Sequence, residues 1–231
     1  MDKARMELDY LTLQIKPHFY LNCLKTLYGM IQQNKGNDAQ QMILYVSQYI
    51  RYTFRDNSSL VPLQTELNQV QNYYKLQKLN TRDSSELTIS ADPSVSEFPV
   101  PMLCIQTFVE NSFKHGRIPG QPLNVHIAVR LTETEEGNYL NISMQDNGTG
   151  FPDEFLQSFL QNEEDTTAGQ HIGIHNLRQR LTLLYKDKAG LICMNGSSGA
   201  MTEIILPVQE EPNPSPDLKN SLLSKENLLS P

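Results

Sequence analysis

The chain has 231 residues, of which 39% are hydrophobic and 19% are charged, and its formal net charge is -7. This negative balance argues against a basic nucleic-acid-binding surface, so no nucleic acid is expected as a partner. Cys23, Cys104 and Cys193 are isolated in the sequence, which excludes a disulfide framework or a zinc site built on paired cysteines. No apolar run approaches the roughly 18 residues that span a bilayer, and the chain is expected to be soluble with one large or two modest domains.

The N-terminal third has the periodicity of helices. Apolar residues recur at three- and four-residue steps over residues 4–33, 39–55 and 62–80, which predicts three helices. Pro17 removes one backbone hydrogen bond inside the first pattern, so it either kinks that helix before His18 or marks a helix boundary. The first two helices alone make a thin core. Two alternatives stay open: a homodimer that brings four helices together, or packing against the rest of the chain.

Residues 81–207 mix strand and helix patterns. Pro101 is predicted to begin one helix, because the missing N–H costs nothing at the first helical position, and Gly173 is predicted to begin another. The segment 133–138 is predicted to be a hairpin turn between two strands. Strands are predicted at 87–89, 123–131, 139–145, 191–194 and 201–206.

Two polar segments lack a clear pattern. Residues 153–170 are long for a structureless connection, so they are expected to form either a mobile lid over a ligand or a simply disordered loop. Residues 208–231 begin with a Pro- and Ser-rich run and are expected to be a disordered tail.

The most informative stretch is residues 145–152, Gln-Asp-Asn-Gly-Thr-Gly-Phe-Pro. The preceding strand delivers Asp146 into a turn where Gly148 and Gly150 let a ligand approach the backbone. A carboxylate beside bare backbone suits a flat ligand with an exocyclic amine. The alternative is an ordinary acidic turn after a strand, because short glycine motifs are weak signals by themselves.

Residues 145–152 and three further stretches together carry a family resemblance. Residues 108–116, 145–152 and 171–181, in this order, resemble the asparagine box and the two glycine boxes of the ATP-binding domain shared by histidine kinases, gyrase-type ATPases and Hsp90-type chaperones. Residues 13–22 resemble the Q-I-x-P-H-F-x-x-N phosphoacceptor motif of the LytS/YesM-type sensor histidine kinases. The resemblance extends over roughly residues 8–207.

This resemblance implies an α+β fold with two parts. Residues 1–80 would form a helical hairpin for dimerisation and histidine phosphotransfer. Residues 81–207 would form an α/β sandwich of the histidine-kinase/gyrase/Hsp90 ATP-binding type.

The resemblance also implies chemical roles. His18 would be the phosphoacceptor, since a neutral imidazole nitrogen is available near pH 7. Asp146 would accept a hydrogen bond from the adenine amine, and Asn111 would hold Mg²⁺ through its side-chain oxygen, a hard donor suited to a hard ion. Many histidine kinases place an acidic residue directly after the histidine, but Phe19 stands there in this chain. The general base is therefore open, with Glu110 as a candidate.

Other nucleotide contacts are expected from both glycine boxes and from Lys114 and His115 at the end of the asparagine box. These two side chains either contact phosphate groups or are cations at the negative end of a helix dipole. Backbone N–H groups at a helix that begins at Gly173 can bind phosphate, although His171 stands where the family often has glycine. The remaining expected contacts are Gly148, Gly150, Ile174, Asn176 and Thr202.

Together these expectations describe a sensor histidine kinase of a two-component system. It would use ATP and Mg²⁺ to phosphorylate His18 and would pass the phosphoryl group to an aspartate of a response regulator. Full-length relatives carry a membrane-spanning sensor region, so this chain is expected to be the cytoplasmic part of such a membrane protein. Two alternatives are a gyrase-like ATPase with no use for His18 and a dimeric nucleotide-binding scaffold without catalysis.

Overall fold

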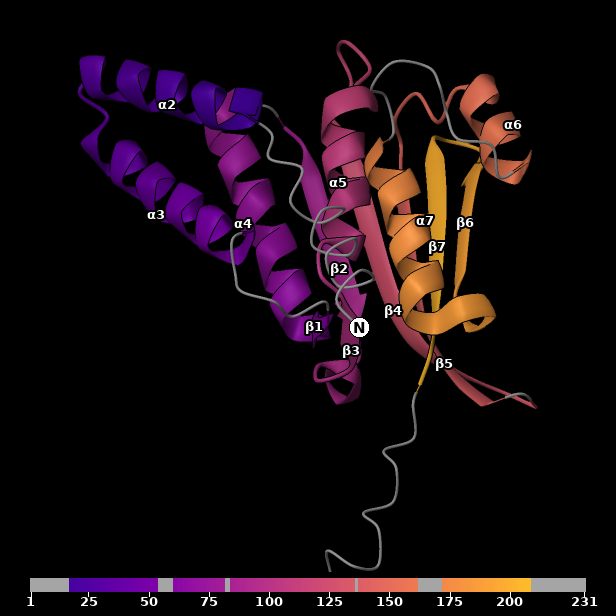
Figure 1. Cartoon of the computed structure of the whole chain (residues 1–231). Helices are drawn as coiled ribbons and strands as arrows, with labels where there is room; N and C mark the ends of the chain where they lie inside the picture. The colour runs from indigo at the N-terminus through magenta and orange to yellow at the C-terminus, as the bar shows by residue number, and fades with distance from the viewer. Residues whose placement is uncertain (1–16, 54–59, 82–83, 136, 162–171, 209–231) are drawn as a thin grey trace, which may run out of the picture.

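The computed structural model of the protein describes residues 17–53, 60–81, 84–135, 137–161 and 172–208. The side chains of residues 17 and 18 lie outside this description, as do the segments between and beyond these ranges. Helices at the N-terminal end lead into a sheet that is covered by further helices on one face (Figure 1). Within the described ranges, no helix combines the length and the apolar character that crossing a membrane requires.

The N-terminal part contains α2 (Pro17–Gln32), α3 (Gly36–Thr53) and α4 (Leu63–Thr81). The three predicted helices are thus present, with shifted bounds, and residues 4–16 and 54–55 of the predictions lie outside the described residues. A small core joins all three helices, so the inner face of the hairpin packs against α4 in the same chain. This core consists of Cys23, Met30, Ala39, Met42 and Leu76.

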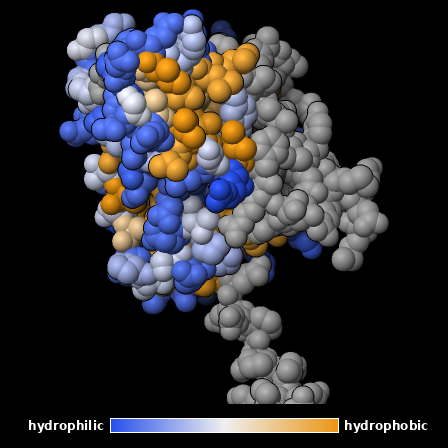
Figure 2. All heavy atoms as spheres, turned by 90° about the vertical axis from the view of Figure 1, so that its left-hand side faces the viewer, coloured by the Kyte–Doolittle hydropathy of each residue, from blue (hydrophilic) through white to orange (hydrophobic). Residues whose placement is uncertain are grey.

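The outer face of the hairpin keeps large hydrophobic side chains exposed, and these residues are called the apolar stripe. They follow helical spacing along α2 and α3, and the orange area of Figure 2 corresponds to this side of the molecule. Their exposed fractions range from 38% to 64%, which is unusual for a row of such residues on a single surface. The apolar stripe comprises Leu21, Leu24, Tyr28, Ile31, Ile43, Leu44 and Ile50.

The second part is a five-stranded sheet in the order β2-β4-β5-β7-β6. The first pair is parallel and the other pairs are antiparallel. Helices α5 (Cys104–His115) and α7 (Ile172–Tyr185) lie side by side against one face of the sheet (Figure 1). This arrangement confirms the expected mixed helix-and-sheet fold. The strands are β2 (Glu86–Ala91), β4 (Asn124–Thr134), β5 (Gly137–Asp146), β6 (Gly190–Asn195) and β7 (Ala200–Pro207).

The core between the sheet and its helices is built from alternate strand residues. Ile127, Leu140 and Ile142 are almost fully buried on the strands, and Ile105 and Ile174 meet them from α5 and α7. Alternation in the sequence predicted these strands because successive side chains point to opposite faces of a sheet.

Two predicted boundaries were wrong. Pro101 does not begin a helix, because it ends β3 (Pro99–Pro101), which pairs with β1 (Leu60–Pro62) in a small separate ribbon. The predicted turn at 133–138 is shorter, since β4 continues to Thr134 and β5 starts at Gly137. Short 3-10 helices also occur at Pro93–Val95 and Lys186–Lys188.

The segment predicted as a lid or loop is partly helical. Its first half forms α6 (Asp153–Gln161), whose Phe155 and Phe159 are buried one turn apart. Residues 162–170 lie outside the described residues. The pattern of two phenylalanines four residues apart was hidden in the sequence by the polar residues around it.

Helix α5 begins without a cap of its own, and Glu66 of α4 supplies one. Leu103, just before the helix, has a left-handed φ of 64° and its side chain gives no cap. Instead the Glu66 carboxylate accepts hydrogen bonds from three backbone N–H groups, that of Leu103 at 2.9 Å and those of Ile105 and Gln106 at 3.1 Å each. Tyr52 of α3 also donates its hydroxyl to Glu66. Burial raises the pKa of Glu66, while these four donors act in the opposite direction.

We expect Glu66→Gln to lower the free energy of unfolding by about 2–3 kcal/mol. The amide places an N–H₂ group where the carboxylate accepted backbone donors, and a fully buried mismatch of this kind cannot be relieved by water. Urea unfolding at neutral pH measures the change. Glu86→Gln, at an exposed position of β2, is the matched control and should change stability little. Equal effects of the two substitutions would contradict the capping role.

Candidate functional site

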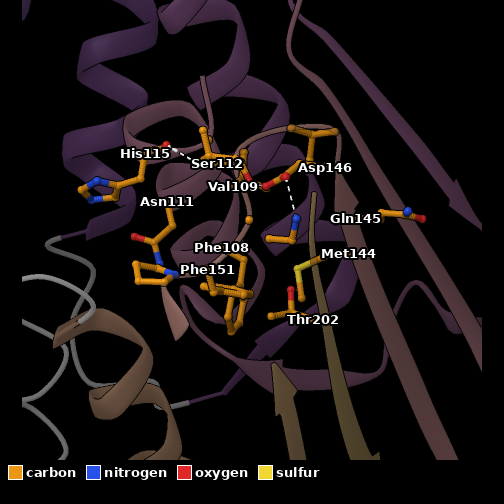
Figure 3. A pocket seen from close by; sticks show the side chains of 16 residues that line it. Phe108, Val109, Asn111, Ser112, His115, Met144, Gln145, Asp146, Phe151 and Thr202 are labelled. Carbon is orange, nitrogen blue, oxygen red and sulfur yellow. Dashed lines mark hydrogen bonds between the residues drawn. The ribbon is translucent and has the colours of Figure 1, made fainter. Parts of the chain in front are cut away.

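A pocket of about 220 Å³ opens between α5, the end of β5 with the loop that follows it, and β7. Figure 3 shows Asp146 and Ser112 on one side of it and Asn111 and His115 on another. The pocket is lined by Phe108, Val109, Asn111, Ser112, His115, Gly116, Val125, Met144, Gln145, Asp146, Thr149, Gly150, Phe151, Pro152, Ala200 and Thr202. It therefore brings together five of the residues predicted from sequence, namely Asn111, His115, Asp146, Gly150 and Thr202.

Much of the pocket wall is apolar, and no sequence motif predicted this part. Phe108 and Val109 come from α5, Met144 from β5 and Phe151 from the following loop. Such a wall with a few fixed polar groups suits a planar ring that is held by stacking and a small number of hydrogen bonds. These residues follow ordinary core periodicity in the sequence, so nothing distinguished them from the rest of the core.

Asp146 is held in place by three hydrogen bonds. Its Oδ1 accepts from the backbone N–H groups of Gly148 and Ala200, each at 3.0 Å, and its Oδ2 accepts from the Ser112 hydroxyl at 2.5 Å. The residue is only 5% exposed. A carboxylate fixed in this way presents its remaining acceptor capacity to the pocket, which suits a ligand amine. Ser112 was not singled out from the sequence, although it directly follows Asn111.

Gly148 does not line the pocket but allows the loop to meet the end of α5. A Cβ atom at Gly148 would lie 2.2 Å from the carbonyl oxygen of Gly116. The backbone N–H of Thr149 donates to the same oxygen at 3.0 Å, and the Thr149 hydroxyl donates to the carbonyl of His115 at 3.0 Å. The two predicted boxes therefore touch through main-chain atoms, and the contact requires a glycine at position 148.

The other end of the loop is held by Asn195 of β6. Its side chain accepts from the N–H of Phe151 at 2.7 Å and donates to the carbonyl of Phe151 at 2.9 Å. Gly150 has a φ of 78°, and a Cβ atom there would lie 2.7 Å from Asn195 Oδ1. No sequence motif includes Asn195, which lies 44 positions after Phe151 in the loop that it supports.

Asn111 lies on α5 at the side of the pocket opposite Asp146 (Figure 3). Its Nδ2 is buried and has no hydrogen-bond partner in the described part of the chain. The side-chain amide is thus not committed to a structural role, and its oxygen fits a Mg²⁺ ligand. His115 also lines the pocket, whereas neighbouring Lys114 is exposed and is not part of the lining.

Glu110 points away from the pocket and toward the N-terminal helices. It is 8% exposed and accepts hydrogen bonds from the Tyr49 hydroxyl at 3.0 Å and from Gln106 Nε2 at 2.7 Å. The ring of Phe19 lies 4.8 Å from that of Tyr49, centroid to centroid. Burial, and then the charge of Glu110, raise the pKa of Tyr49, so this hydroxyl keeps its proton and acts as a donor.

The predicted residues of the second glycine box do not reach this pocket. Gly173 is exposed at the start of α7, and a Cβ atom there would lie 3.1 Å from Thr107 Cγ2. Ile174 is fully buried in the core, and Asn176 is half-buried. The preceding residues, His171 included, lie outside the described part, so the nucleotide contacts of this box stay predictions. The same holds for His18, whose backbone belongs to α2 but whose side chain is not described.

Comparison with known families gives a match for each part of the chain. Residues 100–210 match the family described as histidine kinase-, DNA gyrase B-, and HSP90-like ATPase. The class of the second part is therefore a nucleotide-binding domain of this ATPase type. Residues 6–85 match the family described as histidine kinase. With both matches in one chain, in this order, the protein belongs to the histidine kinases, as the resemblance predicted.

Two sequence relatives agree with this assignment. A sensor protein LytS of Staphylococcus epidermidis is 28% identical over 202 residues, which cover 87% of this chain and 34% of the relative. An uncharacterized sensor-like histidine kinase of the same species is 31% identical over 187 residues, or 80% of this chain and 35% of the relative. The chain thus spans about a third of the length of these relatives. Among solved structures, the histidine kinase domain of the Erythrobacter litoralis EL346 blue-light activated histidine kinase aligns with 90% of this chain and 96% of its own, at 16% identity and a TM-score of 0.47.

We expect Gly148→Ala to weaken nucleotide binding by about tenfold or more. The added methyl group would collide with the backbone of Gly116, and the loop that carries Asp146 would have to move away from α5. Titration calorimetry with ATP and Mg²⁺ measures the affinity. Gly36→Ala is the control, because a Cβ atom there meets nothing within 4 Å. Wild-type affinity in the Gly148 variant would show that the contact between the two boxes does not shape the pocket.

Proposed function

We propose that this chain is the phosphotransfer and catalytic part of a two-component sensor histidine kinase. It would bind ATP in the pocket below α5, phosphorylate His18 and pass the phosphoryl group to an aspartate of a response regulator. The observation that carries the proposal is the geometry of α5. One side of this helix lines the pocket with Asn111, while Glu110 on another side contacts the helix pair that contains His18.

The chemistry requires a nucleophile, a leaving group and a place for one proton. An imidazole nitrogen of His18 attacks the γ-phosphorus, a nitrogen–phosphorus bond forms, and the bond from that phosphorus to the β–γ bridging oxygen breaks. ADP leaves with the electron pair, and the other ring nitrogen of His18, which carries the proton in the neutral imidazole, loses that proton to a base. The nitrogen–phosphorus bond then breaks as an aspartate oxygen of the regulator accepts the phosphoryl group. Positioning and electrostatics dominate such transfers.

The proposal gives separate roles to the polar residues and to the apolar side chains of the pocket. Asp146 accepts a hydrogen bond from the adenine amine, and the apolar side chains of the pocket enclose the adenine ring. When bound, Mg²⁺ supplies neutralisation of phosphate charge, and Asn111 would hold it through Oδ1. His115 lies on the same side of the pocket as Asn111 and would contact the phosphate groups. Thr202 and Gly150 would complete the wall around the adenine ring. Lys114 and the start of α7, with Gly173, Ile174 and Asn176, are proposed contacts of the phosphates.

Glu110 is the base that the contacts favour. Its carboxylate is joined by a hydrogen bond to Tyr49, and the ring of Tyr49 packs against Phe19, the residue that follows His18. Burial raises the pKa of Tyr20, one residue further along α2, and the charge of Glu110 adds to this effect. Glu110 is therefore close to the N-terminal end of α2, and no acidic residue adjoins His18 in the sequence.

A second copy of this chain is the partner proposed for the apolar stripe. Leu21, Leu24, Tyr28 and Ile31 follow steps of three and four residues, so they form one continuous row along α2. Two such rows packed together would make a bundle of four helices from two hairpins. Relatives about three times as long as this chain support the further proposal that it works beside a sensor region at the cytoplasmic face of a membrane.

We expect the wild-type chain to become labelled when it is incubated with Mg²⁺ and γ-labelled ATP, and His18→Ala to stay unlabelled. His126→Ala is the matched control, because His126 is an exposed histidine of β4 outside the pocket and should leave labelling unchanged. Glu110→Gln should bind ATP with wild-type affinity but accept label at least about tenfold more slowly, if it serves as base.

Other outcomes would point to other functions. Equal release of phosphate by the wild type and by His18→Ala, without label on either, would contradict the kinase and identify an ATPase. Tight nucleotide binding with neither label nor release would identify a nucleotide-binding scaffold.

We expect Leu24→Asp to convert the wild-type dimer into a monomer, because a charge in the middle of a desolvated interface is strongly unfavourable. Sedimentation velocity distinguishes the two states. Leu160→Asp provides the control, since Leu160 on α6 is 78% exposed and does not belong to the apolar stripe. A wild type that sediments as a monomer, or a Leu24 variant that stays dimeric, would refute the assignment of this surface.

A further inference from the structure

Ser112 lines the pocket and takes part in the hydrogen bonds that fix Asp146, and the motif gave it no role. It is the residue of α5 directly after Asn111, and its hydroxyl donates to Asp146 Oδ2 at 2.5 Å. Asp146 Oδ1 is occupied separately by the N–H groups of Gly148 and Ala200. A Cβ atom at Gly199 would lie 2.6 Å from Oδ1, so main chain closes that side of the carboxylate.

The number of acceptor positions left on Asp146 follows from these bonds. A carboxylate offers about four lone-pair positions, two on each oxygen. The two backbone donors occupy those of Oδ1, and Ser112 occupies one on Oδ2. One acceptor position on Oδ2 remains for a ligand in the pocket.

This count distinguishes between the purine bases. Adenine presents one exocyclic amine beside a ring nitrogen that accepts, so it needs one acceptor. Guanine presents a ring N–H and an exocyclic amine side by side, so a carboxylate that binds it well must offer two acceptor positions. A site that can satisfy only one of two adjacent donors leaves the other unpaired in a desolvated pocket, which weakens binding.

We propose that Ser112 determines base specificity: by occupying the second position on Asp146 Oδ2, it makes the pocket accept adenine nucleotides and discriminate against guanine nucleotides. Ser112 acts through Asp146 and is a positioning residue. This inference rests on the proposed function, because it assumes that the pocket takes a purine nucleotide. A purely structural bond between α5 and β5 is the alternative, and it would affect all nucleotides alike.

The test compares three ligands on the same protein. Affinities for ATP, for GTP and for the triphosphate of purine riboside, which lacks the exocyclic amine, are measured by titration calorimetry with Mg²⁺. The variants are Ser112→Ala and Ser112→Cys, the second of which nearly preserves volume but donates only weakly. Ser143→Ala is the control. Ser143 lies on β5, the strand that carries Asp146, but its hydroxyl donates to the carbonyl of Ala128 and not to Asp146.

We expect the wild type to prefer ATP over GTP, and we expect this ratio to fall about tenfold in both Ser112 variants while Ser143→Ala keeps it. Affinity for the amine-free nucleotide should be the same in all proteins. An unchanged ratio, or an equal loss for all three nucleotides, would overturn the role of Ser112 while leaving the kinase in place. Failure of the wild type to bind any of the three would instead overturn the proposed function itself.

Discussion

The buried carboxylate of Glu66 is the interaction on which the arrangement of the site depends. It accepts three backbone N–H groups at the start of α5 and the hydroxyl of Tyr52, and it is completely buried. The N-terminal N–H groups of a helix have no partners within the helix, so a buried helix start needs an acceptor from elsewhere. Here the acceptor comes from α4, and the donor Tyr52 from α3. The position of α5 is therefore set by the helices that precede the sheet.

Arg180 supports the same junction from the other side. This arginine of α7 is 4% exposed and donates to the carbonyl of Met102 at 2.5 Å. Burial lowers the pKa of Arg180, and the neighbouring Cys104 and Glu66 act against that shift. Glu66 of α4 and Arg180 of α7 bind residues at the start of α5 directly, and Tyr52 of α3 binds Glu66. The helix that carries Asn111 and Ser112 is therefore fixed by three other helices.

Local patterns in the sequence predicted most of the fold but not the contacts between its parts. Alternation identified β4 and β5, and helical spacing identified α2, α3 and α4, because each pattern reports which face of an element is buried. The ribbon of β1 and β3 was missed, since a three-residue strand that contains proline has no recognisable periodicity. Asp146, Asn111 and the glycines were recognised through motifs, whereas Ser112 and Asn195 act on partners 34 and 44 positions away. Such pairings depend on tertiary structure and leave no local signal.

The wall around the pocket has a consequence for how freely this sequence can change. Where Gly148 approaches Gly116, the atoms in contact are main-chain atoms, and Gly199 approaches the backbone of Asp146 and Gly148 together with the Asp146 carboxylate. Main-chain atoms are the same whatever side chains surround them, so these close approaches tolerate substitutions at neighbouring positions but not at the glycines themselves. The junction between the end of α5, the loop after β5 and the start of β7 thus depends on a few glycines, whereas the surface of the pocket depends on the side chains that line it.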